Sequence, residues 1–99
     1  MWYVYLLRCE DSSLYTGITK DLRRRMKQHS EGRGSAYVAS RGFKRLELAV
    51  TATSRSEALK LEKAVKGVSQ DKKHSQLRKD SDTAYQHLPR LTTVQDKRL

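Results

Sequence analysis

The N-terminal part of the chain contains the feature that most restricts its fold, two strand-like runs joined by a turn. The first run, WYVYLLRC at residues 2–9, is rich in aromatic and β-branched side chains, and the second, LYTGIT, spans residues 14–19. The residues EDSS between them supply turn chemistry. We therefore predict that the chain begins with an antiparallel β-hairpin.

A basic helix is expected after the hairpin. Asp21 is a candidate N-cap for a helix from Leu22 to about Ser30, because its carboxylate can accept hydrogen bonds from the first turn. Gly32 and Gly34 predict that the chain then leaves the helix in a flexible basic loop.

The middle of the chain predicts a third strand and a second helix. Apolar and other residues alternate from Lys44 to Thr51, which is the period of a half-buried strand. Ser54 and Glu57 have the spacing of a capping box, and apolar residues recur at helical intervals from there to about Gly67.

The last predicted element is a helix that ends near Lys79, with Ser69 and Asp71 as its candidate caps. The resulting order β-β-α-β-α-α excludes a doubly wound parallel sheet. It predicts a small α/β fold in which a three-stranded antiparallel sheet is flanked by helices. We expect residues 1–80 to form a single domain and residues 81–99, which are polar and basic with little periodicity, to form a loosely ordered tail.

Length and charge narrow the classes of function. A chain of 99 residues suits one domain, and a formal net charge of +10 with a pI near 10.1 favours a polyanionic partner. Nucleic acid is a simpler partner than an anionic membrane, because the basic helix lacks the broad apolar face of interfacial helices. A single cysteine, Cys9, allows neither an internal disulfide nor a cysteine-based zinc site, and no run approaches a membrane span. We expect a cytoplasmic protein.

The basic helix has two distinct sides. At about 100° per residue, Leu22 and Met26 define the stripe that faces the sheet, and Arg25 and His29 fall beside this stripe. We therefore expect Arg25 and His29 to point toward the edge of the sheet. Three basic residues fall on the far side, where they form either a solvated face or contacts with a nucleic-acid backbone: Arg23, Arg24 and Lys27.

Glu62 occupies an unusual position in the second helix. It falls in the middle of the arc formed by Ala58, Leu61 and Val65, where an unpaired carboxylate is strongly unfavourable. A cation is therefore expected beside it. Two alternatives remain, a metal ion held by Glu62 or an ion pair with Lys66, four residues further along the helix.

Two tyrosines of the hairpin, Tyr5 and Tyr15, are candidate site residues, although strand tyrosines are most often packing residues. They share a face of the sheet only if the hairpin pairs odd-numbered positions with odd. Together with Arg25 as a phosphate binder they predict a nuclease site. A free tyrosine has a pKa near ~10 and needs nearby positive charge to act as a base, whereas the pKa of His29 already suits the task. The general base is therefore Tyr5, assisted by Tyr15, or His29.

These segments form a spaced set of motifs. YVY at residues 3–5 and YTG at residues 15–17 are followed by TKDLRRRMKQH, EGRGSAY, the third strand and SEALKLEKAVK. Over about residues 2–75 the chain resembles the GIY-YIG nuclease superfamily, and it is most similar to the small stand-alone YhbQ-like proteins of bacteria. The resemblance implies five site residues: Tyr5 and Tyr15 as the motif tyrosines, Arg25 as the phosphate-contacting arginine, His29 as the helix histidine and Glu62 as the metal-ligand glutamate.

The chain departs from the family pattern in three ways. Tyr3 replaces the leading glycine of the first tripeptide, Thr16 replaces the isoleucine of the second, and the chain contains no asparagine, which some homing-type members carry late in the domain. The target-finding domains of larger members are also missing. Target selection is therefore expected to be weak or to depend on a partner protein.

The leading interpretation is a metal-dependent nuclease that hydrolyses phosphodiester bonds in DNA, which is favoured over RNA as the partner, and that acts in the repair or processing of branched or damaged DNA. Mg²⁺ is the expected cofactor, with Mn²⁺ as a substitute. The rival interpretations are a nucleic-acid-binding accessory module without turnover and an adaptor for an acidic protein. Four basic residues are candidate nucleic-acid contacts: Arg23, Arg24, Lys27 and Lys66.

Overall fold

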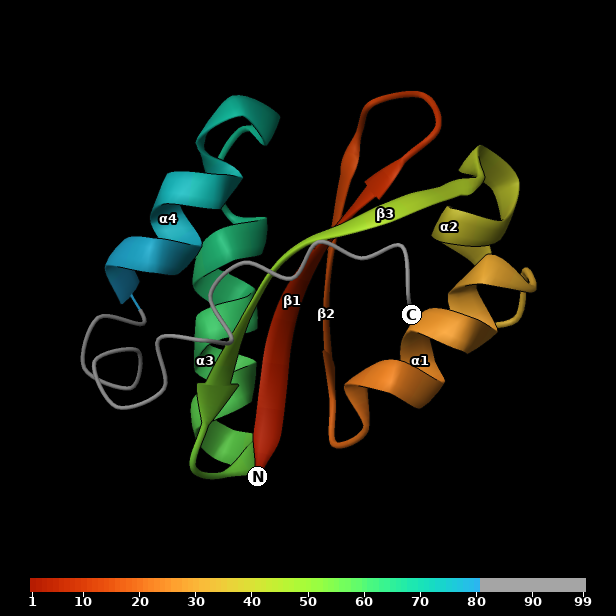
Figure 1. The fold of residues 1–99 in the computed structure, drawn as a ribbon. Coiled ribbons are helices and arrows are strands. Elements are labelled where there is room, and N and C mark those ends of the chain that lie inside the picture. Colours follow the sequence, from red (N-terminus) through yellow and green to blue (C-terminus); the bar gives the residue numbers. More distant parts are fainter. Residues whose placement is uncertain (81–99) are drawn as a thin grey trace.

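A three-stranded antiparallel sheet forms the middle layer of the protein (Figure 1), as seen in a computed structural model that describes residues 1–80. The strands are β1 (Trp2–Cys9), β2 (Leu14–Thr19) and β3 (Phe43–Ala52), and their order in the sheet is β2-β1-β3. Both pairings are antiparallel, which confirms the predicted fold class. The predicted tail at residues 81–99 lies outside the described residues.

The hairpin register places the two candidate tyrosines on one face. Tyr5 lies opposite Gly17 and Leu7 lies opposite Tyr15, so odd-numbered positions pair with odd. Because side chains of directly paired residues project to the same side, Tyr5 and Tyr15 share a face of the sheet. The register required for a shared site is therefore present.

An irregularity in β3 changes which of its side chains face each side. Leu6 pairs with Leu48 but Leu7 pairs with Leu46, so Glu47 is an extra residue at a β-bulge. Residues two apart in a regular strand point to the same side of the sheet, but because of the bulge the side chains of Leu46 and Leu48 lie on opposite sides. The strand also begins and ends one residue beyond the predicted range 44–51.

Two helices cover the face that carries the tyrosines. Helix α1 (Leu22–Ser30) begins at Asp21, whose carboxylate accepts a hydrogen bond from the Arg24 backbone N–H at 3.1 Å, as predicted. Helix α2 (Ala36–Arg41) lies in the region predicted to be a flexible basic loop, so that prediction was wrong in part. The Ser35 hydroxyl accepts a hydrogen bond from Val38 N–H at 3.1 Å and begins this short helix.

Helix α3 (Arg55–Lys66) covers the opposite face and has the predicted start. The Ser54 hydroxyl accepts from Glu57 N–H at 3.1 Å, while the Glu57 carboxylate accepts from Thr53 N–H at 2.8 Å. The two bonds satisfy backbone donors that the helix itself leaves free, as in a capping box whose carboxylate reaches one residue further back.

The last helical region differs from the prediction at its start. A 3₁₀ turn, η1 (Gln70–Lys72), precedes α4 (Lys73–Asp80). Ser69 does not cap it, because its hydroxyl donates instead to the Asp71 carboxylate at 2.7 Å. Helix α4 packs beside α3 on the same side of the sheet (Figure 1).

The sheet separates two apolar clusters of different composition. On the α3–α4 side the cluster consists of aliphatic residues, with Trp2 and Ile18 packed against it: Val4, Leu6, Leu48, Val50, Ala52, Ala58, Leu61, Val65 and Leu77. On the α1–α2 side the buried residues include a tyrosine and a cysteine: Tyr5, Leu7, Cys9, Met26, Val38, Leu46 and Ala49.

A side chain from η1 ties down the edge strand β2. The Gln70 carboxamide oxygen accepts a hydrogen bond from Leu14 N–H at 2.6 Å, and its nitrogen donates to Leu14 C=O at 3.4 Å. Both outward-facing backbone groups of Leu14 are thereby satisfied.

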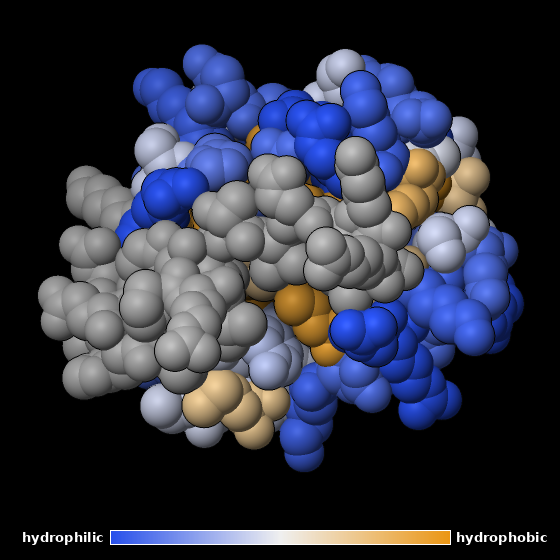
Figure 2. Space-filling model, viewed as in Figure 1, coloured by the Kyte–Doolittle hydropathy of each residue, from blue (hydrophilic) through white to orange (hydrophobic). Residues whose placement is uncertain are grey.

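The surface carries the charge of the chain. The face in Figure 2 is mainly hydrophilic wherever described residues are visible, with small hydrophobic areas between the charged groups. Within residues 1–80, the helices are too short or too polar to cross a bilayer.

Candidate active site

Tyr5 and His29 form a buried hydrogen-bonded pair between β1 and α1. Tyr5 Oη and His29 Nε2 are 2.8 Å apart, and the two residues are 0% and 2% exposed. Their rings meet nearly edge to face, with centroids 5.8 Å apart. The tyrosine of the first strand run and the histidine of the basic helix therefore act as one structural unit.

Two glycines make room for this pair. A Cβ on Gly17, directly across from Tyr5 in the hairpin, would lie 2.6 Å from Tyr5 Cζ. A Cβ on Gly34 would lie 2.6 Å from His29 Cγ. Both distances are far inside van der Waals contact, so the close approach of the two rings to the backbone requires glycine at both positions.

Burial keeps both members of the pair neutral at pH 7. It raises the pKa of Tyr5, which the nearby Tyr15 and Glu62 raise further, whereas the positive charge of Arg25 opposes the shift. Burial, with a smaller contribution from Arg25, lowers the pKa of His29 from 6.5 to about 4. The buried Nδ1 of His29 has no hydrogen-bond partner among the described residues.

Tyr15 and Tyr37 extend the aromatic group toward the surface. The Tyr15 ring centroid lies 5.5 Å from that of His29, 6.3 Å from that of Tyr5 and 5.6 Å from that of Tyr37. The guanidinium of Arg41 lies over the Tyr37 ring at 4.1 Å. Sequence reasoning missed Tyr37, because a helix of six residues shows no period; the one available signal was Ser35, at N-cap spacing before Val38.

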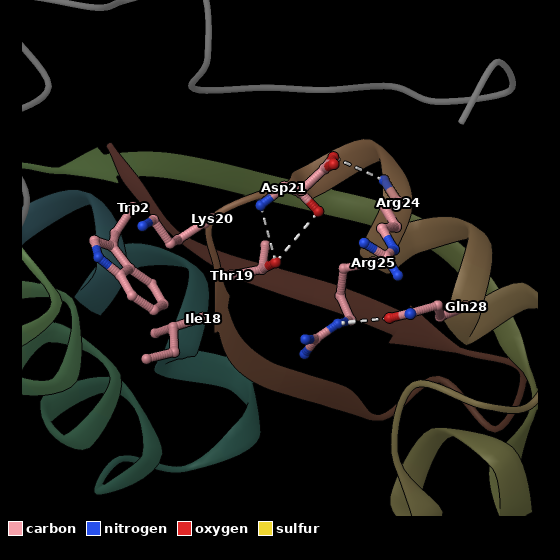
Figure 3. Close-up of a pocket in the computed structure, with 8 residues that line it drawn as sticks. All are labelled: Trp2, Ile18, Thr19, Lys20, Asp21, Arg24, Arg25 and Gln28. Carbon is pink, nitrogen blue, oxygen red and sulfur yellow. Dashed lines mark hydrogen bonds between the residues drawn. The ribbon is translucent and has the colours of Figure 1, made fainter.

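Arg25 leaves α1 at the edge of the buried pair. It is half-buried, and its Nε donates to the Gln28 carboxamide oxygen at 3.0 Å. The two residues line one end of a pocket of about 390 Å³ whose other end is formed by Trp2 and Ile18 (Figure 3). The predicted phosphate binder thus lies between the Tyr5–His29 pair and an open pocket.

Glu62 reaches the same region from α3. Its side chain is 19% exposed and pairs with Lys66 Nζ at 3.2 Å, so the ion-pair alternative is the one formed in this structure. Lys66 also lies over the Tyr15 ring at 5.9 Å, and the negative charge of Glu62 makes a small contribution to the raised pKa of Tyr5. In the described part of the chain, no three His, Cys, Asp or Glu residues gather as a ready-made metal site.

The four predicted nucleic-acid contacts are exposed on helices α1 and α3. Arg23, Arg24 and Lys27 are exposed on α1, and Lys66 is exposed on α3. Arg24 also lines the pocket beside Arg25. The structure therefore brings Tyr5, Tyr15, Arg25, His29 and Glu62 to one region and leaves the predicted nucleic-acid contacts around it.

Comparison with known proteins shows the family of the chain. The family model of the GIY-YIG catalytic domain matches residues 1–75. A UPF0213 protein of Cupriavidus pinatubonensis is 49% identical over 72 residues, which cover 73% of this chain and 80% of that protein. A UPF0213 protein of Halalkalibacterium halodurans is 41% identical over 92 residues, covering 93% of this chain and 97% of the relative. The chain belongs to the GIY-YIG family, as its motifs predicted.

A solved structure is also similar. It is the solution NMR structure of a UPF0213 protein from Bacillus halodurans, which is 40% identical, covers 95% of this chain and 100% of its own, and superposes with a TM-score of 0.48.

Proposed function

We propose that the chain is a metal-dependent nuclease that hydrolyses phosphodiester bonds in DNA. The observation that carries this proposal is the buried Tyr5–His29 hydrogen bond, placed beside the guanidinium of Arg25 and within reach of the charge of Glu62. A neutral proton-transfer pair next to a cation can assist in-line attack of water on a phosphate, because the pair accepts a proton and the cation neutralises the growing charge.

The proposed reaction requires one water molecule to reach Tyr5 Oη, which is 0% exposed before substrate binds. This water gives a proton to Tyr5 Oη as the phenol proton passes to His29 Nε2. The hydroxide so formed attacks phosphorus, the bond to the leaving oxygen breaks, and solvent protonates that oxygen. The extra proton on His29 then returns through Tyr5 to solvent, which restores the neutral pair. The negative charge of the bound phosphate raises the pKa of His29 from its low resting value, which favours this transfer. Arg25 neutralises charge on the non-bridging oxygens, and Tyr15 orients the water or the phosphate.

The donor set fits a divalent cation at Glu62. Mg²⁺ keeps several waters and accepts phosphate oxygens readily, so one carboxylate from the protein is a sufficient anchor, and Mn²⁺ can substitute. Lys66 is 53% exposed, so its ammonium can turn to solvent and leave the carboxylate free. A bound cation would polarise the phosphate and stabilise the leaving oxygen.

The basic surface completes the proposal. Arg23, Arg24, Lys27 and Lys66 would track the phosphate backbone without reading sequence, so target selection would depend on DNA structure or on a partner protein. Repair or processing of branched or damaged DNA suits such a protein. A cytoplasmic location is part of the proposal and is supported by Cys9, which is free.

The alternative is a nucleic-acid-binding accessory module without turnover. The ion pair between Glu62 and Lys66 favours the accessory module, because a carboxylate that stays paired with a lysine is not available to bind a metal ion. In that case the buried tyrosine and histidine would only hold α1 against the sheet.

A cleavage assay separates the two functions. The purified chain is incubated with Mg²⁺ or Mn²⁺ and with single-stranded, duplex and branched DNA and RNA. Glu62→Gln and Arg25→Ala should reduce cutting by at least about 100-fold. Glu57→Gln on α3 and Arg45→Ala, at an exposed arginine of β3 outside the proposed site, are the matched controls, and they should retain the turnover rate.

Each outcome has a defined meaning. Loss of cutting in Glu62→Gln with unchanged DNA affinity supports the proposed metal ligand. Equal cutting by every variant would indicate a contaminating nuclease and overturn the proposal. Tight binding with no cutting of any substrate would establish the accessory module.

A further inference from the structure

The pocket next to Arg25 has a second end that the proposed hydrolysis does not use. It lies where β2 runs into α1, and Figure 3 shows Trp2 and Ile18 on one side and Arg25 and Gln28 on the other. Its volume of about 390 Å³ is within the range of ligand sites. The pocket therefore continues from the expected phosphate position to an aromatic wall.

Trp2 is the only tryptophan of the chain and is half-buried rather than fully enclosed. One part of the indole packs with Ile18 against the aliphatic cluster, while another lines the pocket. Packing against the cluster fixes the orientation of the ring, so it forms a rigid flat wall for a ligand.

Two cations flank this indole. Lys20 Nζ lies 5.7 Å and Arg55 Cζ lies 6.0 Å from its ring centroid. Neither has a salt bridge to a carboxylate among those found in residues 1–80. Lys20 lines the pocket together with Arg24 and Arg25, so the lining carries positive charge, and its one carboxylate, on Asp21, accepts a hydrogen bond from the N–H of Arg24.

We propose that this pocket is a nucleotide subsite in which an unpaired base stacks on Trp2 while the neighbouring phosphate rests on Arg25. An aromatic face bordered by cations is the arrangement that binds single-stranded nucleic acid, because every base has a π-face and every linkage a phosphate. A base inside a duplex is already stacked on its neighbours and would have to leave the helix. The inference rests on the proposed function and specifies its substrate as a nucleotide outside a duplex.

The single tryptophan makes the stacking directly measurable. Fluorescence of the full-length chain is recorded without added metal, so that no cutting occurs, as a single-stranded oligonucleotide of thymidines is added. Saturating DNA should quench the emission strongly. An abasic strand of the same length has the same phosphates but no bases, and it should bind more weakly and leave most of the emission.

Two variants test the energetics. Trp2→Phe keeps a flat ring and should retain affinity for the thymidine strand within about 3-fold. Trp2→Leu keeps apolar packing against Ile18 but offers no stacking face, and it should lose about 5- to 100-fold in affinity for that strand. Affinity for the abasic strand should be the same in both variants. Circular dichroism confirms that each variant is folded before binding is measured.

The results separate the subsite from the nuclease. Unchanged emission at saturation, or equal quenching by the abasic strand, would overturn the subsite even if the chain cuts DNA. Quenching that requires bases, in a chain that never cuts any substrate, would keep the subsite and reject the nuclease.

Discussion

The two faces of the sheet are built from alternate residues of the same strand, yet they carry different chemistry. On the α3–α4 side, Val4 and Leu6 of β1 pack into a cluster of aliphatic side chains. On the α1–α2 side, Tyr5 lies between them in sequence and is as deeply buried, but its hydroxyl bonds to a histidine whose other ring nitrogen has no partner within residues 1–80.

The difference shows how a small domain can remain stable while it buries a polar site. One face supplies apolar burial of about 0.8 kcal/mol per buried CH₂ group, while the other places two polarisable rings where their pKa values are displaced. Strand β1 contributes side chains to both faces. A substitution on the aliphatic face should mainly lower the free energy of unfolding, and one on the tyrosine face should mainly lower cleavage activity. The predictions below use that contrast.

The largest contrast is expected between neighbouring residues of β1. Leu6→Ala should lower the free energy of unfolding by about 2–5 kcal/mol through lost burial and a cavity. Tyr5→Phe should cost only about 1 kcal/mol, because the ring remains, yet reduce cleavage by about 10²–10⁴-fold. Urea unfolding and cleavage per folded molecule measure both. Similar activity losses in the two variants would remove the distinction between the faces.

Glycine variants test the close approach at the Tyr5 ring. Gly17→Ala should lower the free energy of unfolding by about 1–3 kcal/mol and displace Tyr5 from His29, because the new Cβ overlaps the phenol ring. Gly67→Ala is the matched control, since its Cβ would meet only carbonyl oxygens at 3.5 and 3.6 Å. Thermal unfolding of the two variants should differ clearly, and equal midpoints would contradict the packing described here.

The pH dependence of stability should identify His29. Its pKa is about 4 in the folded state and 6.5 ordinarily, so the unfolded chain binds a proton first as the pH falls. The stabilisation is complete above pH 6.5 and is lost toward pH 4, by on the order of 2–3 kcal/mol in total.

The control for this titration is on the other side of the sheet. His74 on α4 also has a lowered pKa, mainly through burial, but it is more exposed than His29. Urea unfolding between pH 6.5 and 5 should lose more of its pH slope in His29→Gln than in His74→Gln. A larger change in His74→Gln would show that the titrating group lies on the α3–α4 side and would contradict the assignment to His29.

The smallest effect is expected at the ion pair on α3. Lys66→Met should change the free energy of unfolding by less than about 0.5 kcal/mol, because exposed pairs contribute little. It should nevertheless tighten Mn²⁺ binding in isothermal titration, since the ammonium no longer competes for Glu62. Lys63→Met makes the same change of charge on the same helix and should leave Mn²⁺ affinity nearer to wild type. Equal affinities would count against Glu62 as the metal ligand.

Much of this arrangement could be predicted from sequence because it depends on local periodicity. The aromatic and β-branched side chains of WYVYLLRC predicted β1, and the helix geometry placed Arg25 and His29 toward the sheet and Arg23 toward solvent. The hairpin register was predicted only as a condition, because it depends on how the turn at residues 10–13 closes.

The parts that sequence did not predict depend on contacts between distant segments. The bulge at Glu47 arises from the pairing of β3 with β1, and helix α2 is too short to show a period. Ser69 has the residue type of an N-cap, but its hydroxyl donates a hydrogen bond to the Asp71 carboxylate instead. Trp2 was predicted only as a strand residue, and its place opposite Arg25 depends on the three-dimensional course of the β2 edge.

The carboxamide of Gln70 at the end of β2 has a further consequence. Edge strands offer free backbone groups on which a strand from a second molecule can assemble, and such pairing leads to swapped dimers or fibrils. Gln70 occupies both outward groups of Leu14, so a foreign strand arriving at this end finds no hydrogen-bonding template. One side chain thereby blocks intermolecular strand pairing at the Leu14 end of β2.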